Sequence, residues 1–242
     1  MAISTGKNKG KGMTLPSLQG KKVALIAMGK SHGAYSIARA NSIEYDEVWT
    51  INAMGGVFSC DRMFMLDPPS RFLDDDVAGN QTKIMRDILT NEQEFLIYSC
   101  ATDTRCPSVV DFPLQEVMQG SGHFYFNTTP AYALGFAAAT GVQELHLYGL
   151  DYAYRNNVYV AEAGRACAEF WIGVLTSKGC KIVIAPESSL LDTDVPPEEK
   201  LYGYHRLPDP LRIDVEDGQF SVKLQSMYTE PPEPEDGLLY KG

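Results

Sequence analysis

Residues 127–152 constrain the fold more than any other stretch of the chain, because a helix signal there runs directly into a strand signal. Thr128 and Thr129 are residue types that cap the amino ends of helices, and Pro130 suits the first helical turn. The alanine-rich run that follows predicts a helix of about three turns. Gly141 is expected to end this helix, because glycine readily takes the left-handed conformation found there.

The same stretch then predicts a short strand. Residues 144–148 are mostly apolar, and Gly149 closes them. The carboxyl end of this strand brings Asp151 and Tyr152 to the edge of a sheet, beside the amino end of the preceding helix. In open α/β sheets, ligands bind outside the carboxyl ends of strands and near helix amino ends. The pattern therefore predicts a ligand site at this edge.

Composition bounds the class of protein. The chain has 242 residues, of which 44% are hydrophobic, so we expect one domain with appendages. The formal net charge of -10 disfavours binding to nucleic acid or to an anionic membrane. No run approaches the roughly 20 apolar residues of a membrane-spanning helix. Five scattered cysteines lack the spacing of a metal site or a disulfide scaffold, so we expect a cytoplasmic protein without a resident metal.

The first structured unit begins with an apolar run. Residues 21–28 are typical of a strand buried on both faces, a glycine-containing loop follows, and residues 34–40 predict a helix. Backbone N–H groups in such a loop attract phosphate. The loop lacks the complete fingerprint of a dinucleotide or triphosphate site, so phosphate binding and a plain strand-to-helix connection both stay open. The loop residues concerned are Gly29, Lys30, Ser31, His32 and Gly33.

Two further strands end on polar side chains. The strand expected over residues 47–52 ends on Asn52, and the strand expected over residues 63–66 is followed by Asp67. In a parallel sheet both side chains lie at the edge where ligands bind. The alternative is that Asn52 and Asp67 only cap turns.

The segment before the threonine pair is predicted to be peripheral. The acidic run at residues 74–76 is expected to be a solvated face rather than a metal site. A helix over residues 82–89 and a strand over residues 95–98 follow. Residues 99–126 are broken by proline and glycine, which predicts mostly loop and a lid over the site. His123 lies in this loop and is a candidate catalytic residue.

The rest of the chain predicts a helix over residues 162–178, a strand over residues 180–185 and a β-hairpin over residues 212–224. Alternating strands and helices indicate an α/β fold with a Rossmann-like, doubly wound, mostly parallel sheet, followed by the hairpin and an acidic, proline-rich tail. We predict a flexible N-terminal segment over residues 1–20 and a Rossmann-like nucleotide-binding domain over residues 21–191. A linker, the hairpin and the tail make up residues 192–242.

Residues 128–152 resemble the bacterial sialyltransferase-type glycosyltransferases. They also resemble the wider superfamily of motility accessory factors and 6-hydroxymethylpterin diphosphokinase-like proteins. The resemblance rests on a Thr-Thr-Pro-Ala-Tyr start, a Gly-Val-Gln-Glu-Leu turn and a Tyr-Gly-Leu-Asp-Tyr finish. Weaker similarity continues at residues 23–31, 50–52 and 66–68 and ends near residue 190.

The resemblance implies roles for residues that the strand ends and the helix start already single out. It implies a nucleotide cradled by the loop of residues 29–33. It places Asn52 and Asp67 near the ribose and phosphates, and Thr128 and Thr129 at the leaving phosphate. Asp151 and Tyr152 would help to shape the sugar or acceptor pocket.

The chain departs from the family pattern at two places. Lys30, Ser31 and His32 replace a small Gly-Pro-Ser turn, which adds positive charge near the expected phosphate. The family's histidine general base has no counterpart in residues 152–178. A general base must reach the acceptor hydroxyl. The remaining candidates are His32, His123, His205 and Asp151, of which we take His123 and Asp151 as the catalytic candidates.

We therefore expect a nucleotide-dependent transferase, in the first place a glycosyltransferase with a nucleotide-sugar donor and an acceptor that the sequence does not identify. One alternative is a pyrophosphokinase-like enzyme, which uses Mg-ATP. The other is a non-catalytic nucleotide-binding or scaffolding module that acts through its acidic tail. The C-terminal segment is the expected contact for a protein partner or for a second copy of the chain.

Overall fold

The computed structural model describes residues 14–76, 79, 81–152, 158–195, 209, 211–216 and 219–227. The chain divides into two compact units, Met1–Asp194 and Val195–Gly242. The candidate site lies entirely in the first unit. Within the described ranges, no helix combines the length and the apolar character that crossing a bilayer requires.

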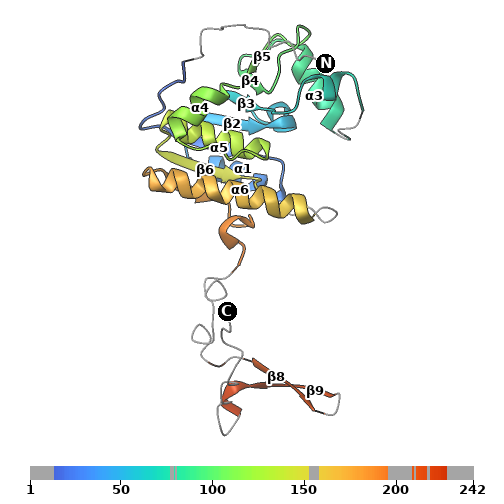
Figure 1. The fold of residues 1–242 in the computed structure, drawn as a ribbon, viewed down its shortest axis with the longest axis vertical. Coiled ribbons are helices and arrows are strands. Elements are labelled where there is room, and N and C mark those ends of the chain that lie inside the picture. The colour runs from blue at the N-terminus through green and yellow to red at the C-terminus, as the bar shows by residue number, and fades with distance from the viewer. Residues whose placement is uncertain are drawn as a thin grey trace, which may run out of the picture. The chain divides into compact units, whose positions relative to one another are not determined.

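The first unit is built on a seven-stranded sheet in which all described strand pairs are parallel (Figure 1). The strand order is β5-β4-β3-β2-β1-β6-β7, so the winding direction reverses between β1 and β6. This arrangement confirms the predicted doubly wound α/β fold. The strands are Lys22–Ile26 (β1), Glu47–Ile51 (β2), Arg62–Phe64 (β3), Leu96–Ser99 (β4), Val109–Asp111 (β5), Glu144–Tyr148 (β6) and Lys181–Ile184 (β7).

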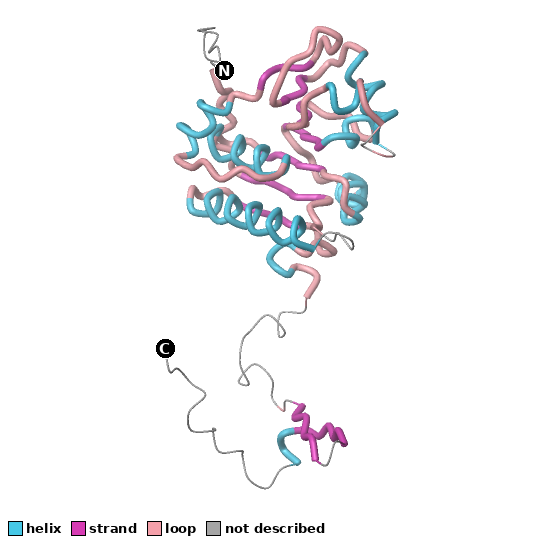
Figure 2. The backbone as a smooth tube through the Cα atoms, turned by 45° about the vertical axis from the view of Figure 1, so that its right-hand side comes forward, coloured by secondary structure: helices cyan, strands magenta, loops and turns pink. Residues whose placement is uncertain are grey.

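Helices cover both faces of this sheet, as Figure 2 shows from a second direction. Side chains of α5 and α6 pack against one face, and side chains of α1 pack against the other. The helices are Gly33–Ala40 (α1), Ser70–Leu73 (α2), Gln81–Thr90 (α3), Leu114–Ser121 (α4), Thr129–Thr140 (α5) and Val158–Ser177 (α6).

The central strand β1 is buried on both faces, as its apolar run predicts. Val23 and Leu25 belong to the core beneath α5 and α6, whereas Ala24 and Ile26 belong to the core beneath α1. Successive side chains of a strand point to opposite faces, so an unbroken apolar run supplies both layers. Each large side chain buried in this way contributes roughly 1.5–3 kcal/mol to folding.

Residues 99–126 are mostly irregular, as predicted, but two elements of this segment were not predicted. This segment contains the edge strand β5 and the helix α4. Pro113 takes the N-cap position of α4, and Gly122 ends that helix in the left-handed conformation. Here proline and glycine mark the ends of a helix and do not indicate irregular structure.

The second unit contains the predicted hairpin. Leu211–Glu216 (β8) pairs antiparallel with Gln219–Leu224 (β9), and Leu211 lies opposite Leu224. The Asp-Gly turn, the proline-rich linker and the acidic tail lie outside the described residues, as do residues 1–13 and His205.

Candidate functional site

A cleft of about 850 Å³ opens where the winding direction of the sheet reverses. The loops that follow β1 and β6 line it. The end of β2, the segment from Asp67 to Arg71 and the starts of α3, α5 and α6 also contribute to its walls. Ligands of open α/β sheets bind at this position, outside the carboxyl ends of the strands. A separate hollow of about 640 Å³ lies beside the carboxyl ends of α5 and α6, and no predicted site residue lines it.

Most of the predicted site residues meet in this cleft. The ones that line it are Gly29, Lys30, Asn52, Asp67, Thr128, Thr129, Asp151 and Tyr152. They come from segments far apart in the sequence. They meet here because the parallel topology brings the carboxyl ends of the strands to one edge of the sheet. Ser31, His32, Gly33 and His123 are not among the lining residues.

The loop after β1 is not an open phosphate nest, contrary to the expectation that its N–H groups are available. The Gly29 N–H donates to the Gly149 carbonyl over 2.8 Å, and the Ser31 N–H donates to Asp151 Oδ2 over 2.8 Å. The N–H groups of His32 and Gly33 donate within the loop, because residues 30–32 form a 3₁₀ turn. The loop therefore uses these donors to fold on itself and on β6.

Asp151 and Ser31 form a latch between the loops that follow β1 and β6. The Ser31 hydroxyl donates to Asp151 Oδ1 and accepts from the Gly149 N–H over 2.9 Å. Asp151 is 4% exposed, and both of its carboxylate oxygens receive a hydrogen bond from Ser31. A Cβ at Gly29 would lie 2.5 Å from Asp151 Oδ2, so only glycine fits beside the latch.

Three buried side-chain oxygens around the cleft have no hydrogen-bond partner within the described part of the chain. They are Asn52 Oδ1, Gln81 Oε1 and Thr128 Oγ1. Thr128 takes the N-cap position of α5, but its hydroxyl makes no capping hydrogen bond, unlike the predicted cap. An unsatisfied buried acceptor costs roughly 1–3 kcal/mol. All three residues line the same cleft, so a polar ligand bound there would supply hydrogen-bond partners that the described residues do not.

Backbone strain occurs at the same place. Asn52 has a φ of 49° and Tyr152 has a φ of 47°, which is the left-handed region that side chains other than glycine rarely adopt. Both residues line the cleft and directly follow strand ends or their closing turns. Strain of this kind is characteristic of functional sites, where it holds a side chain in a required direction.

Positive charge is present on the cleft walls. Lys30 is exposed at its rim, and Arg71 donates to Asp67 Oδ1 over 2.7 Å. The amino end of α5 adds partial positive charge, and its first turn contains no acidic residue. The arrangement suits an anionic group near Lys30 and Thr129.

Arg71 and Gln81 also line the cleft, and the sequence interpretation missed both of them. Arg71 lies on the short helix α2, which was not predicted, and Gln81 is the first residue of α3. The signal for Arg71 was its position four residues after Asp67, a spacing that places the two side chains together on a helical turn. The sequence around Gln81 predicts the start of a helix but gives no sign that this residue reaches the cleft.

The two candidate histidines that the structure describes lie away from the cleft lining. His123 makes edge contacts with Phe170 and Trp171, with ring centroids 5.3 and 6.0 Å apart. His32 Nδ1 lies 2.8 Å from the Gly29 carbonyl, which it binds within its own loop. Neither position brings an imidazole to the ligand cleft.

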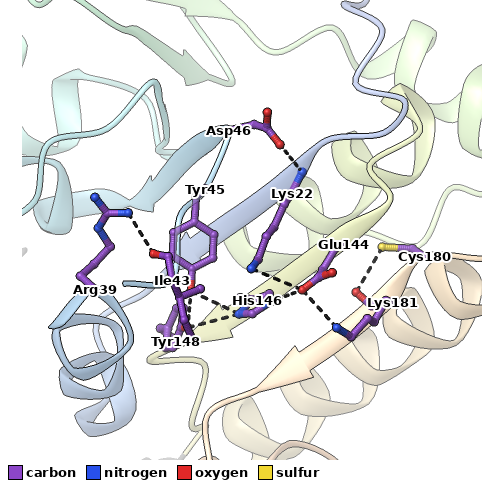
Figure 3. Close-up of polar contacts among 10 residues, drawn as sticks. All are labelled: Lys22, Arg39, Ile43, Tyr45, Asp46, Glu144, His146, Tyr148, Cys180 and Lys181. Carbon is purple, nitrogen blue, oxygen red and sulfur yellow. Dashed lines mark hydrogen bonds and ion pairs between the residues drawn. The ribbon is translucent and has the colours of Figure 1, made fainter. Parts of the chain in front are cut away.

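A buried polar cluster lies on the α1 face of the sheet (Figure 3). His146 Nε2 binds Glu144 over 2.6 Å, and the Tyr45 hydroxyl lies 3.2 Å from His146 Nδ1 and 2.6 Å from the Tyr148 hydroxyl. Burial lowers the pKa of His146. Lys22 and Lys181 pair with the same Glu144 carboxylate. This cluster joins Tyr45 to β6 and belongs to the framework of the sheet.

The acidic side chains near α2 are engaged in surface ion pairs. Asp74 binds Arg105 and Asp76 binds Arg86. Among the residues that the structure describes, no three His, Cys, Asp or Glu side chains gather closely enough to hold a metal ion.

Fold and site together define a doubly wound α/β protein with a ligand cleft at its topological switch point. No protein-family model matches the sequence, and no curated protein matches it. The chain is similar to solved structures of the sialyltransferase CstII from Campylobacter jejuni. Its sequence identity to the CstII structure in complex with the substrate analogue CMP-3FNeuAc is 18%, and the TM-score is 0.43. The match covers 70% of this chain and 83% of that chain. For the CstII structure in complex with cytidine-5'-monophosphate, the identity is 19% and the TM-score is 0.42, over 70% of this chain and 82% of that chain.

A structure of the sialyltransferase CST-II with a trisaccharide acceptor and CMP is similar to the same degree. Its identity to this chain is 18% and its TM-score is 0.43, over 70% of this chain and 83% of that chain.

Proposed function

We propose that the chain is a nucleotide-dependent transferase that takes a nucleotide sugar as donor in the switch-point cleft. The observation that carries this proposal is the set of unpartnered buried oxygens of Asn52, Gln81 and Thr128. Ribose and sugar hydroxyls are hydrogen-bond donors and match these acceptors. We place the phosphate at the amino end of α5, because the partial positive charge of the helix and Lys30 attract an anion there. Of the other charged residues that line the cleft, Arg71 and Asp67 pair with each other, and Asp151 binds Ser31.

In this proposal, the reaction depends on stabilising the leaving phosphate. Negative charge that develops on the phosphate oxygens is stabilised by Lys30 and by the helix amino end at Thr129. Asp151 acts by holding the loop after β1 through Ser31, because both of its carboxylate oxygens already accept hydrogen bonds. Asn52 and Gln81 orient the hydroxyl-bearing part of the donor.

A thermal-shift panel with CMP, UDP, GDP and ATP, each with and without Mg²⁺, tests the proposal on the full chain. Ligand at a hundred times its Kd stabilises the folded state by about 2.7 kcal/mol. For a chain of this size, that corresponds to a rise in Tm of roughly 5–10 °C. We expect such a rise with one of the nucleotides of the panel, without a requirement for Mg²⁺.

Two variants locate the effect. Gln81→Ala should reduce the shift, and Gln119→Ala, the same change at an exposed position of α4, should leave it intact. A response to ATP that needs Mg²⁺ favours the pyrophosphokinase alternative. No response to any nucleotide contradicts nucleotide binding altogether.

A further inference from the structure

The switch-point cleft contains a carboxylate with one oxygen free to accept a proton. Asp67 follows β3 and lines the cleft. Its Oδ1 accepts a hydrogen bond from Arg71 over 2.7 Å. Its Oδ2 has no hydrogen-bond partner within the described part of the chain, and the side chain is 30% exposed. An ionised carboxylate oxygen in this state is open to a hydroxyl group of a ligand.

Two sets of contacts hold Asp67 in place. The hydroxyl of the fully buried Ser99, at the end of β4, donates to the Asp67 carbonyl over 2.9 Å. Arg71, four residues after Asp67, binds the carboxylate, and the Arg71 N–H donates to the Pro68 carbonyl over 3.0 Å. Backbone and side chain are thus both fixed before a ligand binds. A base that a third group orients in this way is the usual arrangement in catalytic sites.

The other titratable groups of the cleft are less suited to accept a proton. Asp67 and Asp151 are the two carboxylates among the described residues that line the cleft, and no histidine is among these residues. Both oxygens of Asp151 accept from Ser31, and Asp151 is 4% exposed. Charged lysine and arginine side chains only donate. A general base must lie within hydrogen-bond reach of the hydroxyl that it activates, and Asp67 has the oxygen for this contact.

The strand order places Asp67 across the cleft from the expected leaving group. β3 lies two strands away from β1 in the sheet. Strands are spaced roughly 4.8 Å apart, so the ends of β3 and β1 are about 10 Å apart. Lys30 lies in the loop after β1. Inverting glycosidases, which activate a water on the face of the sugar opposite the leaving group, separate their two carboxyl groups by about 6.5–9.5 Å. The cleft therefore has room for one sugar between Asp67 and Lys30.

We propose that Asp67 is the general base of the transfer, an inference that rests on the nucleotide-sugar donor proposed above. Asp67 Oδ2 takes the proton of the attacking hydroxyl while the hydroxyl oxygen forms a bond to the anomeric carbon of the sugar. The bond from that carbon to the phosphate oxygen breaks, and its electron pair stays on the phosphate. Lys30 and the amino end of α5 stabilise this charge. Arg71 is a positioning residue that acts through Asp67.

Hydrolysis of a donor tests this role without knowledge of the acceptor, because water then supplies the attacking hydroxyl. The full chain is incubated with CMP-N-acetylneuraminate, UDP-glucose or GDP-mannose, and the released nucleotide is quantified. Asp67→Asn keeps an oxygen that accepts from Arg71 but removes the basic group. We expect kcat to fall about a hundredfold or more. The Kd of the free nucleotide, measured by calorimetric titration, should change less than about threefold.

Two further variants separate a base from a structural residue. Asp111→Asn is the matched control, because Asp111 is exposed at the carboxyl end of β5 and does not line the cleft. It should keep the kcat of wild type. Asp67→Ala leaves the Arg71 guanidinium unpaired, so added formate can place a carboxylate beside it. We expect formate to restore part of the turnover of Asp67→Ala and to have no effect on wild type.

The outcomes distinguish the base from the proposed function. Undiminished turnover of Asp67→Asn, equal losses of kcat and of nucleotide affinity, or a lack of rescue by formate would each overturn the base while leaving the transferase in place. Nucleotide binding without hydrolysis of any donor by wild type would overturn the base and leave only a nucleotide-binding cleft. A wild type that binds no nucleotide would contradict the proposed function and the base together.

Discussion

Asp151 binds Ser31 across the switch point of the sheet, although the two residues are 120 positions apart in the sequence. The Asp151 carboxylate accepts from both the N–H and the hydroxyl of Ser31, and the same hydroxyl accepts from the Gly149 N–H. The two loops that bound the candidate cleft are therefore joined by one buried carboxylate. Its hydrogen bonds fix the shape of the loop after β1 relative to the loop after β6.

The latch predicts strong energetic coupling between its two residues. Ser31→Ala and Asp151→Asn should each lower the free energy of unfolding by about 2–3 kcal/mol, because each removes a hydrogen bond to a buried charged group or leaves a donor unmatched. The double variant should cost at least about 1 kcal/mol less than the sum of the two changes. Urea denaturation of the four proteins measures this, and strictly additive costs would show that the two side chains act independently.

Two glycines of α6 differ in what surrounds them, because one packs against residues that line the cleft and the other does not. A Cβ at Gly164 would lie 2.7 Å from Tyr152 Cε1 and 3.1 Å from Thr128 Cγ2, whereas a Cβ at Gly173 meets nothing within 4 Å. Gly173→Ala should stabilise the protein by about 0.5–1 kcal/mol, because alanine favours helix. Gly164→Ala should lose this gain, cost roughly 1–3 kcal/mol and weaken nucleotide binding by displacing Thr128. Thermal denaturation compares the two, and equal stabilisation would argue against tight packing of Tyr152 on α6.

The buried His146 predicts a pH dependence of stability. Burial lowers its pKa in the folded state, so the unfolded chain takes up a proton first as the pH falls. The stabilising contribution is complete above pH of about 6.5 and is lost as the pH falls from there through the folded pKa. Over this window wild type should lose up to about 1.4 kcal/mol per pH unit more than His146→Gln.

Urea denaturation between pH 5.5 and 8 measures the difference between the two proteins. This range lies above the titration of Glu144, whose pKa is lowered by its hydrogen bond with His146. Burial raises the pKa of Tyr45 and of Tyr148, so both hydroxyls keep their protons over this range. Lys22 and Lys181, the remaining charged groups of the cluster, pair with the Glu144 carboxylate in both proteins. Parallel curves for wild type and variant would contradict the prediction.

Local signals predicted most of the sheet and the helices that pack on it, but not β5, α2 and α4. The threonine pair, the alanine run and Gly141 predicted α5 because a helix start and stop depend on neighbouring residues. The apolar run of β1 predicted a strand buried on both faces, which the core confirms. Strand ends at Asn52 and Asp67 were placed at the cleft because parallel strands share one carboxyl edge.

Long-range contacts determined what the sequence did not reveal. Ser31 was expected to face a phosphate, but its hydroxyl and N–H bind Asp151 on a distant loop. Gln81 reaches the cleft only because α3 starts beside the end of β2. His123 precedes the threonine pair by a few residues, yet its ring contacts α6 instead of the cleft. Each outcome depends on tertiary packing that local spacing does not encode.

Calorimetric titration of the nucleotide selected by the thermal-shift panel into wild type, Thr128→Ala and Thr176→Ala tests the central claim most directly. The buried Thr128 Oγ1 has no partner among the described residues and lines the cleft, whereas Thr176 is exposed near the end of α6. A hydrogen bond worth about 1.5 kcal/mol predicts that Thr128→Ala raises the Kd roughly tenfold while Thr176→Ala leaves it unchanged. Equal affinity of all three proteins would contradict a nucleotide site at the amino end of α5.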